Sequence, residues 1–414
     1  MKQDNFIVYG YRWIVLVVFM FIVAITQLLW ITFAPITGDA AKFYGVSDLS
    51  IGLLSMSFMI VYIVVSIPAS WVIDTYGIRV GVGIGAVLTA VFGLLRGLWA
   101  SNYTLVLIAQ IGIAIGQPFV LNAVTTVAAR WFPVRERATA SGLGSLAMYL
   151  GIFLGLALTP TLAIHFQIGG MLLAYGIASV VAALVFVLFA RERPATAPCA
   201  PGMEVRSLVF DGFKQMLHQK NFILLLVIFF IGLGTFNAVT TWIEDIVRPN
   251  HISSTQAGVI GGLMVVGGIL GALVIPTLSD RYRKRTPFII VALAGATLGL
   301  AGIAYATSYW LLLVAAFVMG FFLLSAGPIG FQYGAETTYP TPEGTSNGLL
   351  ILMGQISGIV FIFGMDSFKS PVTGSMTLSL VVMIVLMVLS LVLSFFLKEP
   401  KTLLTESVKP ADAA

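Results

Sequence analysis

The residues of this chain that could do chemistry are aromatic and amide side chains inside long apolar runs. Trp30 lies well inside the first run, and Gln27 stands one helical turn earlier on the same face. Most tryptophans of membrane proteins lie at the interface, so one in the interior packs against a helix or faces a cavity. The neighbouring amide favours a hydrated cavity. We therefore expect Gln27 and Trp30 to line a binding site.

Further polar residues interrupt the apolar runs that come later in the chain. Gln117 and Asn122 lie near 103–129, Tyr149 near 139–164 and Gln355 near 344–365. A polar side chain is costly inside a membrane unless it is partnered or hydrated. These residues therefore face a central cavity or, alternatively, join neighbouring helices by hydrogen bonds.

No catalytic or metal-binding constellation is visible. The chain has one cysteine, Cys199, which excludes an intramolecular disulfide and a cysteine metal cluster. No two of its three histidines have a metal-ligand spacing. We expect no cofactor and no enzymatic activity. A membrane-embedded enzyme or sensor is the remote alternative.

Composition places the chain in the membrane. Its 414 residues are 59% hydrophobic and only 9% charged, and the mean hydropathy is +1.01. Soluble domains carry about 25% charged residues. The net charge of +5 is better explained by membrane topology than by a nucleic-acid partner.

Twelve apolar runs are long enough to cross a bilayer, which takes about 20 residues. They form two groups of six, separated by a polar stretch that contains Pro194, Pro198 and Pro201. The sequence therefore predicts an all-α polytopic membrane protein with two six-helix bundles. The expected divisions are residues 1–190, a cytoplasmic linker at 191–220, residues 221–398 and a cytoplasmic tail at 399–414.

Basic residues predict the orientation, because lysine and arginine favour the cytoplasmic side. With the amino terminus inside, all but four of the 22 lysines and arginines fall on that side. The four on the outer side are Lys42, Arg96, Arg248 and Lys369. We expect both termini to be cytoplasmic and the protein to lie in an inner (plasma) membrane.

A polar turn occurs twice, at 74–79 and again at 280–285, with 206 residues between Asp74 and Asp280. The same offset pairs Trp30 with Phe236 and Tyr149 with Gln355. Duplicated six-span halves are typical of transporters that bind substrate near the membrane midplane. The sequence therefore predicts a transporter that alternates access to a site lined from both halves.

The duplicated turn resembles the loop signature of the major facilitator superfamily. Longer strings, Pro68 to Arg79, Gly330 to Pro340 and Ser346 to Leu350, resemble the feline leukaemia virus subgroup C receptor-related transporters. The resemblance implies a facilitator fold and a small organic solute, such as choline, ethanolamine or haem. Short loops and a compact linker favour a bacterial member.

The resemblance also implies roles for individual residues. In that family a tryptophan at the position of Trp30 belongs to an aromatic cage around a quaternary ammonium, and Gln355 matches a glutamine that contacts substrate. The second cage residue, a tyrosine, is replaced here by Asn237, which weakens the inference of choline. Phe236 supplies the missing wall or simply packs against a helix or lipid. Tyr149 stands where the relatives have glutamine.

Charged residues at the cytoplasmic ends of the spans are predicted to form a gate. We expect them to latch the two halves when the protein opens outward and to separate when it opens inward. The alternative is that the basic residues of these loops, Arg285 among them, only set topology. The proposed gate residues are Asp74, Arg79, Arg130, Asp280, Arg281 and Glu336.

None of the 17 acidic residues lies in the middle of a span, although proton-coupled transporters usually have one there. We therefore expect a facilitative uniporter of a small, amphipathic or cationic solute. The alternative is a proton-coupled exporter of drugs, metabolites or organic anions that uses Glu244, Asp245 or Glu336. The expected partners are the solute and membrane lipid, without nucleic acid, and the protein is expected to be a monomer.

Overall fold

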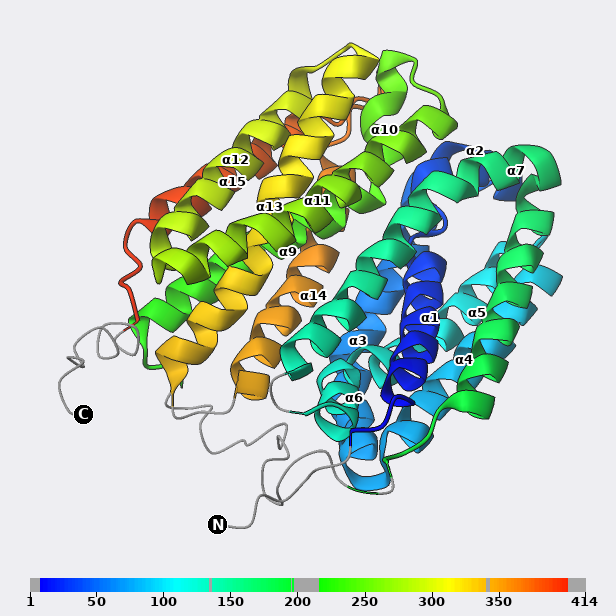
Figure 1. Ribbon diagram of the computed structural model, residues 1–414. Helices are drawn as coiled ribbons and strands as arrows, with labels where there is room; N and C mark the ends of the chain where they lie inside the picture. Colours follow the sequence, from blue (N-terminus) through cyan, green and yellow to red (C-terminus); the bar gives the residue numbers. More distant parts are fainter. Residues whose placement is uncertain (1–7, 134–135, 195, 197–215, 340–342, 401–414) are drawn as a thin grey trace, which may run out of the picture. The chain divides into compact units, whose positions relative to one another are not determined.

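The computed structural model describes residues 8–133, 136–194, 196, 216–339 and 343–400. It divides into two compact units, Met1–Arg206 and Ser207–Ala414, and every element of both units is helical within these residues (Figure 1). Most of the expected linker and nearly all of the expected tail lie outside the described residues.

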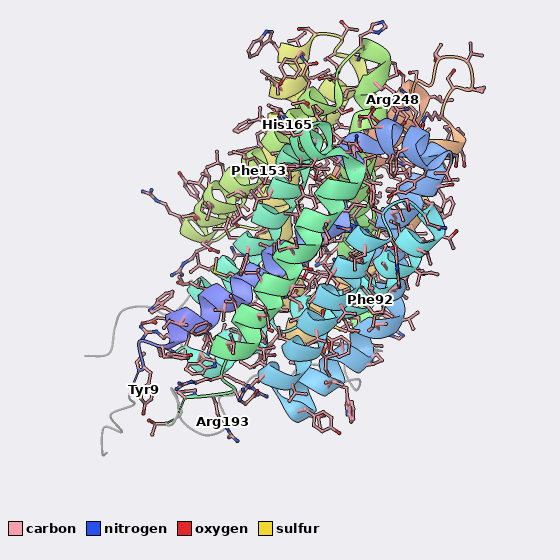
Figure 2. The ribbon with its side chains drawn as sticks, turned by 90° about the vertical axis from the view of Figure 1, so that its right-hand side faces the viewer. Tyr9, Phe92, Phe153, His165, Arg193 and Arg248 are labelled. Carbon is pink, nitrogen blue, oxygen red and sulfur yellow. The ribbon has the colours of Figure 1, made fainter. Side chains whose placement is uncertain are left out.

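Unit 1 consists of long helices joined by short turns. Its elements are α1 (Arg12–Ile31), η1 (Ala34–Ile36), α2 (Thr37–Tyr44), α3 (Asp48–Tyr76), α4 (Ile78–Leu98), α5 (Tyr103–Leu121), α6 (Val124–Trp131) and α7 (Arg137–Phe189). Gln167 interrupts α7 with a non-helical backbone (φ 57°, ψ 172°), and the chain turns back there (Figure 1). The two spans expected near 139–164 and 169–190 are therefore both contained in α7. Figure 2 shows His165 near one end of this unit, with Tyr9 and Arg193 at the other.

Unit 2 repeats this plan. Its elements are α9 (Lys220–Thr241), α10 (Ile243–Val247), η4 (Arg248–Asn250), α11 (Ser254–Tyr282), α12 (Thr286–Tyr305), α13 (Tyr309–Thr338), α14 (Glu343–Ser367) and α15 (Thr377–Ser394). Local sequence explains where the helices begin. For example, Ser253 and Gln256 form a reciprocal capping box at the start of α11.

Among the described residues, eleven helices are long and apolar enough to cross a membrane. Because the segment Thr139–Phe189 contains two spans joined at Gln167, the twelve runs of the sequence are accounted for. Large apolar side chains on the outside, such as Val64, Leu188 and Trp310, are more than half exposed. An apolar exterior of this kind suits a multi-pass membrane protein.

Helix packing follows the same order in the two units. In unit 1, α1 packs on α7, α3 on α5, and α4 on α7; in unit 2, α9 packs on α14, α11 on α13, and α12 on α15. Small residues allow close approach at these contacts. At Gly151, an added Cβ would overlap the backbone carbonyl of Ala24, so the α1–α7 contact requires glycine.

The duplicated turn has a positive φ at the same repeat position in both copies, although the two backbone conformations differ. Gly77 (φ 96°) separates α3 from α4, and Arg283 (φ 50°) lies between α11 and α12. A Cβ at Gly77 would also overlap the carboxylate of Glu192. Arg283 is in the left-handed helical region (ψ 41°), which non-glycine residues can adopt, whereas Gly77 (ψ 174°) is outside it and requires glycine.

Candidate functional site

The polar residues of α1 are buried inside unit 1. Trp30 is 6% exposed and Gln27 is 5% exposed. The indole Nε1 of Trp30 donates to the backbone oxygen of Ser55 on α3, at 3.2 Å. The ring is therefore oriented by a hydrogen bond between α1 and α3.

Gln117 and Asn122 sit near the end of α5 and have different partners. The Nε2 atom of Gln117 donates to Oε1 of Gln27, at 3.4 Å, so the structure brings these two predicted residues together. Asn122 accepts from the Tyr62 hydroxyl at 2.7 Å and donates to Ser66 and Ser70 on α3. Its amide therefore joins the end of α5 to α3, which is the alternative to a role in lining the cavity.

Tyr149 is half-buried on the first part of α7. Beside it, α1 and α7 form an apolar groove of about 300 Å³ whose lining includes Ala24, Leu28, Leu150 and Leu154. Neither Gln27 nor Trp30 lines this groove. The groove therefore offers contact for a hydrocarbon group but no polar recognition.

The predicted residues of unit 2 lie on α9 and α14. Phe236 is 5% exposed, and Nδ2 of Asn237 donates to the backbone oxygen of Gly354, at 3.2 Å. Gln355 follows Gly354 on α14 and is half-buried, and its side chain makes no hydrogen bond within the described part of the protein. Asn237 thus holds α9 against α14 next to an amide that is available to a ligand.

Two of the three predicted gate residues of unit 2, Asp280 and Glu336, contact Arg285. Its guanidinium pairs with Asp280, and it donates to Glu336 through Nη2 at 3.0 Å and Nε at 3.3 Å. The Arg285 side chain is 8% exposed, that of Glu336 is 11% and that of Asp280 is 68%. Arg281, also predicted, is exposed and has no partner among the described residues.

Arg285 was not among the predicted gate residues, and a role in topology alone was the alternative for the basic residues of its loop, but its guanidinium has two carboxylate partners. Burial lowers the pKa of its guanidinium, but the hydrogen bonds and charges of Glu336 and Asp280 outweigh burial and raise that pKa above its ordinary value. The cation is therefore permanent and forms the centre of a charge cluster at this end of unit 2.

Unit 1 has a related cluster. Arg130 pairs with Glu192, whereas Asp74 and Arg79 are exposed. The Glu192 carboxylate also accepts from the backbone N–H groups of Ile78 and Arg79, at 3.2 and 2.8 Å. An anion at the start of α4 is favoured by the helix dipole. The cluster therefore ties the end of α7 to the start of α4.

Glu192 and Glu399 were missed in the sequence, although they stand 207 positions apart, close to the repeat offset. Glu399 accepts from the backbone N–H groups of Arg285 and Thr286, at 3.0 and 2.9 Å. Each glutamate follows the last helix of its unit and fastens that end to the duplicated turn. The repeat offset was the signal that could have found them.

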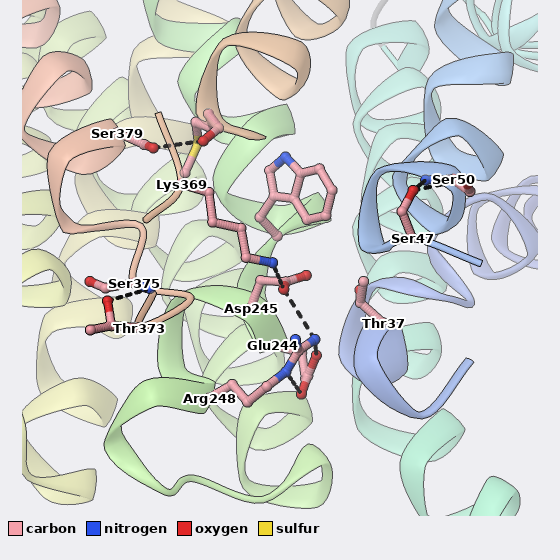
Figure 3. A network of polar contacts seen from close by, with 12 residues as sticks. Thr37, Ser47, Ser50, Glu244, Asp245, Arg248, Lys369, Thr373, Ser375 and Ser379 are labelled. Atoms are coloured by element: carbon pink, nitrogen blue, oxygen red, sulfur yellow. Dashed lines mark hydrogen bonds and ion pairs between the residues drawn. The ribbon is translucent and has the colours of Figure 1, made fainter. Parts of the chain in front are cut away.

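A second set of charges surrounds α10, which follows the carboxyl end of α9 (Figure 3). Glu244 and Asp245 are 4% and 1% exposed. Arg248 pairs with both, and Nζ of Lys369 lies 2.7 Å from Oδ1 of Asp245. Two of the four cations expected on the outer side therefore neutralise the buried acids of α10.

Arg96 was also expected to be an outer-side charge, but it is fully buried on α4. Its Nη1 atom donates to the backbone oxygen of Leu29 at 3.1 Å and to Oε1 of Gln110 at 2.7 Å. The sequence signal was its position inside an apolar run.

Within the described residues no group of His, Cys, Asp and Glu could hold a metal ion.

The chain as a whole is similar to a known family of proteins. The family model described as Major Facilitator Superfamily matches residues 16–362 and 245–411. Solute carrier family 49 member A3 of Xenopus tropicalis is 30% identical over 390 residues, which cover 90% of this chain and 80% of that protein. The human choline/ethanolamine transporter FLVCR2 is 27% identical over 372 residues, which cover 84% of this chain and 70% of that protein.

Solved structures share the fold at low sequence identity. A bacterial homologue of the human lysosomal transporter Spinster, in an inward-facing and unoccupied conformation, has a TM-score of 0.74 at 16% identity and covers 97% of this chain and 99% of its own. A mutant of the nucleoside transporter NupG has a TM-score of 0.71 at 12% identity, covering 92% of this chain and 99% of its own. The all-α fold expected from the sequence is confirmed.

Proposed function

Because this chain belongs to the Major Facilitator Superfamily of membrane transporters, we propose that it carries a small organic cation of the choline or ethanolamine type by facilitated diffusion. The chain is a transporter and not an enzyme. The single observation that carries the proposal is the buried group of Gln27, Trp30 and Gln117, which offers a ring face and amides without a carboxylate.

This chemistry favours a weakly hydrated cation. A quaternary ammonium is attracted to the face of an indole by cation–π interaction, worth about 0.5–2 kcal/mol. A primary ammonium would instead prefer hydrogen-bond acceptors, such as the amide oxygen of Gln27 in unit 1. Related proteins named as choline/ethanolamine transporters support the same class of solute.

Phe236, Asn237, Gln355 and Tyr149 are proposed as further substrate-binding residues. Within unit 2, Phe236 is a buried aromatic side chain, and the side-chain amide of Gln355 has no hydrogen-bond partner among the described residues. Asn122 has its amide engaged between α3 and α5, so we assign it an indirect role.

Uniport is supported because the acidic residues that proton coupling would require are already paired with cations. Glu244, Asp245 and Glu336 are each engaged by Arg248, Lys369 or Arg285. α1, α5 and α9, which carry most of the proposed site, contain no Asp or Glu. We propose that the clusters around Arg285 and Glu192 act in gating, in a monomer in the inner membrane with both termini cytoplasmic.

Proteoliposomes test the proposal. Purified protein should equilibrate labelled choline or ethanolamine down its gradient, and an imposed pH gradient should not drive accumulation above equilibrium. Protein-free liposomes are the control. No protein-dependent flux of either solute would refute the substrate class, and accumulation driven by the pH gradient would refute uniport.

A further inference from the structure

Helix α1 ends before the apolar span that contains it ends. The span that contains it runs from Arg12 to Tyr44, but regular α-helix stops at Ile31 and resumes only at Thr37. The last carbonyl groups of a helix have no partner within it. Leu29 and Ile31 at this end are 0% exposed, so side chains of the protein must satisfy the buried carbonyl groups.

Three side chains meet this need at Leu29. The backbone oxygen of Leu29 accepts from Nη1 of Arg96 at 3.1 Å, from Nε2 of Gln110 at 3.4 Å and from Oγ1 of Thr32 at 3.2 Å. Arg96 and Gln110 are also joined directly, at 2.7 Å. Together they clamp the end of α1 from α4 and α5.

Charge explains why an arginine occupies this place. Arg96 is 0% exposed, and it forms no ion pair with any residue the structure describes. Its guanidinium instead lies at the carboxyl end of α1, where the helix dipole favours a cation. It also lies over the Phe33 ring, with Cζ 5.8 Å from the ring centre. Such a cation is costly to bury, so the clamp is stable only while the end of α1 stays in place.

Trp30 directly follows the clamped residue. Its indole N–H reaches the Ser55 oxygen on α3, so the residue is held by its backbone from one side and by its ring from the other. A shift of the Leu29 carbonyl would carry the indole with it. We propose that Arg96 and Gln110 are positioning residues that hold Trp30 in its substrate-binding orientation. This inference rests on the proposed function of Trp30.

The test compares Arg96→Met with Thr89→Ala. Thr89 is equally buried on α4, but its hydroxyl bonds only within its own helix, to the Gly85 oxygen. Arg96→Met should weaken choline binding at least about tenfold, since hydrogen bonds to charged groups are lost, and should shift the Trp30 fluorescence, measured as the difference from a Trp30→Phe protein. Thr89→Ala should leave both unchanged.

A second variant covers the case in which Arg96→Met does not fold. Gln110→Glu keeps an acceptor for Arg96 and balances its charge, but it has no donor for the Leu29 oxygen. It should fold, shift the Trp30 emission in the same direction and weaken choline binding about threefold.

Non-additivity distinguishes positioning from a general structural role. In a Trp30→Leu protein, Arg96→Met or Gln110→Glu should cause no further loss of choline affinity. Additive losses, or Trp30 emission that matches wild type in both Arg96→Met and Gln110→Glu, would overturn the inference. A wild type that does not bind choline would instead overturn the proposed function, and the emission measurement would still decide the positioning.

Discussion

Replacing Glu336 by Gln should destabilise unit 2 far more than replacing Asp280 by Asn, although both acids pair with Arg285. The two carboxylates differ in burial, at 11% and 68% side-chain exposure, while Arg285 itself is 8% exposed. Both replacements keep the shape of the side chain and remove only its charge. The comparison therefore isolates the effect of carboxylate burial, because Arg285 is the partner in both pairs.

The magnitudes follow from that burial. Breaking a buried pair costs about 3–5 kcal/mol, and because Arg285 keeps Asp280, we expect Glu336→Gln to cost about 3 kcal/mol. An exposed pair is worth about 0–1 kcal/mol, so Asp280→Asn should cost no more than that. For a unit of this size, 1 kcal/mol shifts Tm by about 2–4 °C. We therefore expect Glu336→Gln to lower Tm by about 6–12 °C and Asp280→Asn to lower it by at most about 4 °C.

Heating in detergent followed by size-exclusion chromatography measures both shifts. Arg285→Met provides the matched background, in which Glu336→Gln should produce little further loss. Equal shifts for the two variants, or a larger one for Asp280→Asn, would refute the assignment of Arg285 and Glu336 as a buried pair.

Three further predictions concern other contacts. Glu192→Gln removes the anion at the start of α4 and should lower Tm by about 2–8 °C, whereas Arg79→Gln, which loses only an exposed side chain, should change it little; equal losses would contradict the capping role. Asn122→Leu should lower Tm but change choline affinity less than about twofold, and a tenfold loss of affinity at unchanged Tm would show direct binding instead. Lys369→Met should lower Tm by at least about 4 °C because it breaks a pair with the buried Asp245; a shift below about 1 °C would contradict that pairing.

The spans and their duplication were predictable because run length and repeat spacing are properties of the sequence itself. The 206-residue offset correctly relates the turns at Gly77 and Arg283, which share a positive φ. Polar residues inside apolar runs also led to Gln27 and Gln117, which prove to be partners. Their contact required two helices to pack, but each residue was conspicuous alone.

What the sequence concealed was the burial of charge near span ends. Arg96, Arg248 and Lys369 look like ordinary outer-side cations, because a charge close to a predicted boundary normally reaches water. Only the break of α1 at Ile31 gives Arg96 a carbonyl to bind inside unit 1. Pro35 marks the break, because a proline removes the hydrogen bond to the residue four positions earlier. The partners of the freed carbonyl groups depend on how α4 and α5 pack, so neither the clamp nor the role of Gln110 could be derived from the sequence.

The central claim is that the face of Trp30 recognises a cation, and a pair of isosteres tests it most directly. Choline and its uncharged carbon isostere, 3,3-dimethylbutanol, should be compared as ligands of the wild type, Trp30→Phe and Trp30→Leu. From cation–π energies of about 0.5–2 kcal/mol, wild type should prefer choline by about 2–30-fold. The preference should persist in part with Phe and vanish with Leu. An undiminished preference in Trp30→Leu would contradict the account.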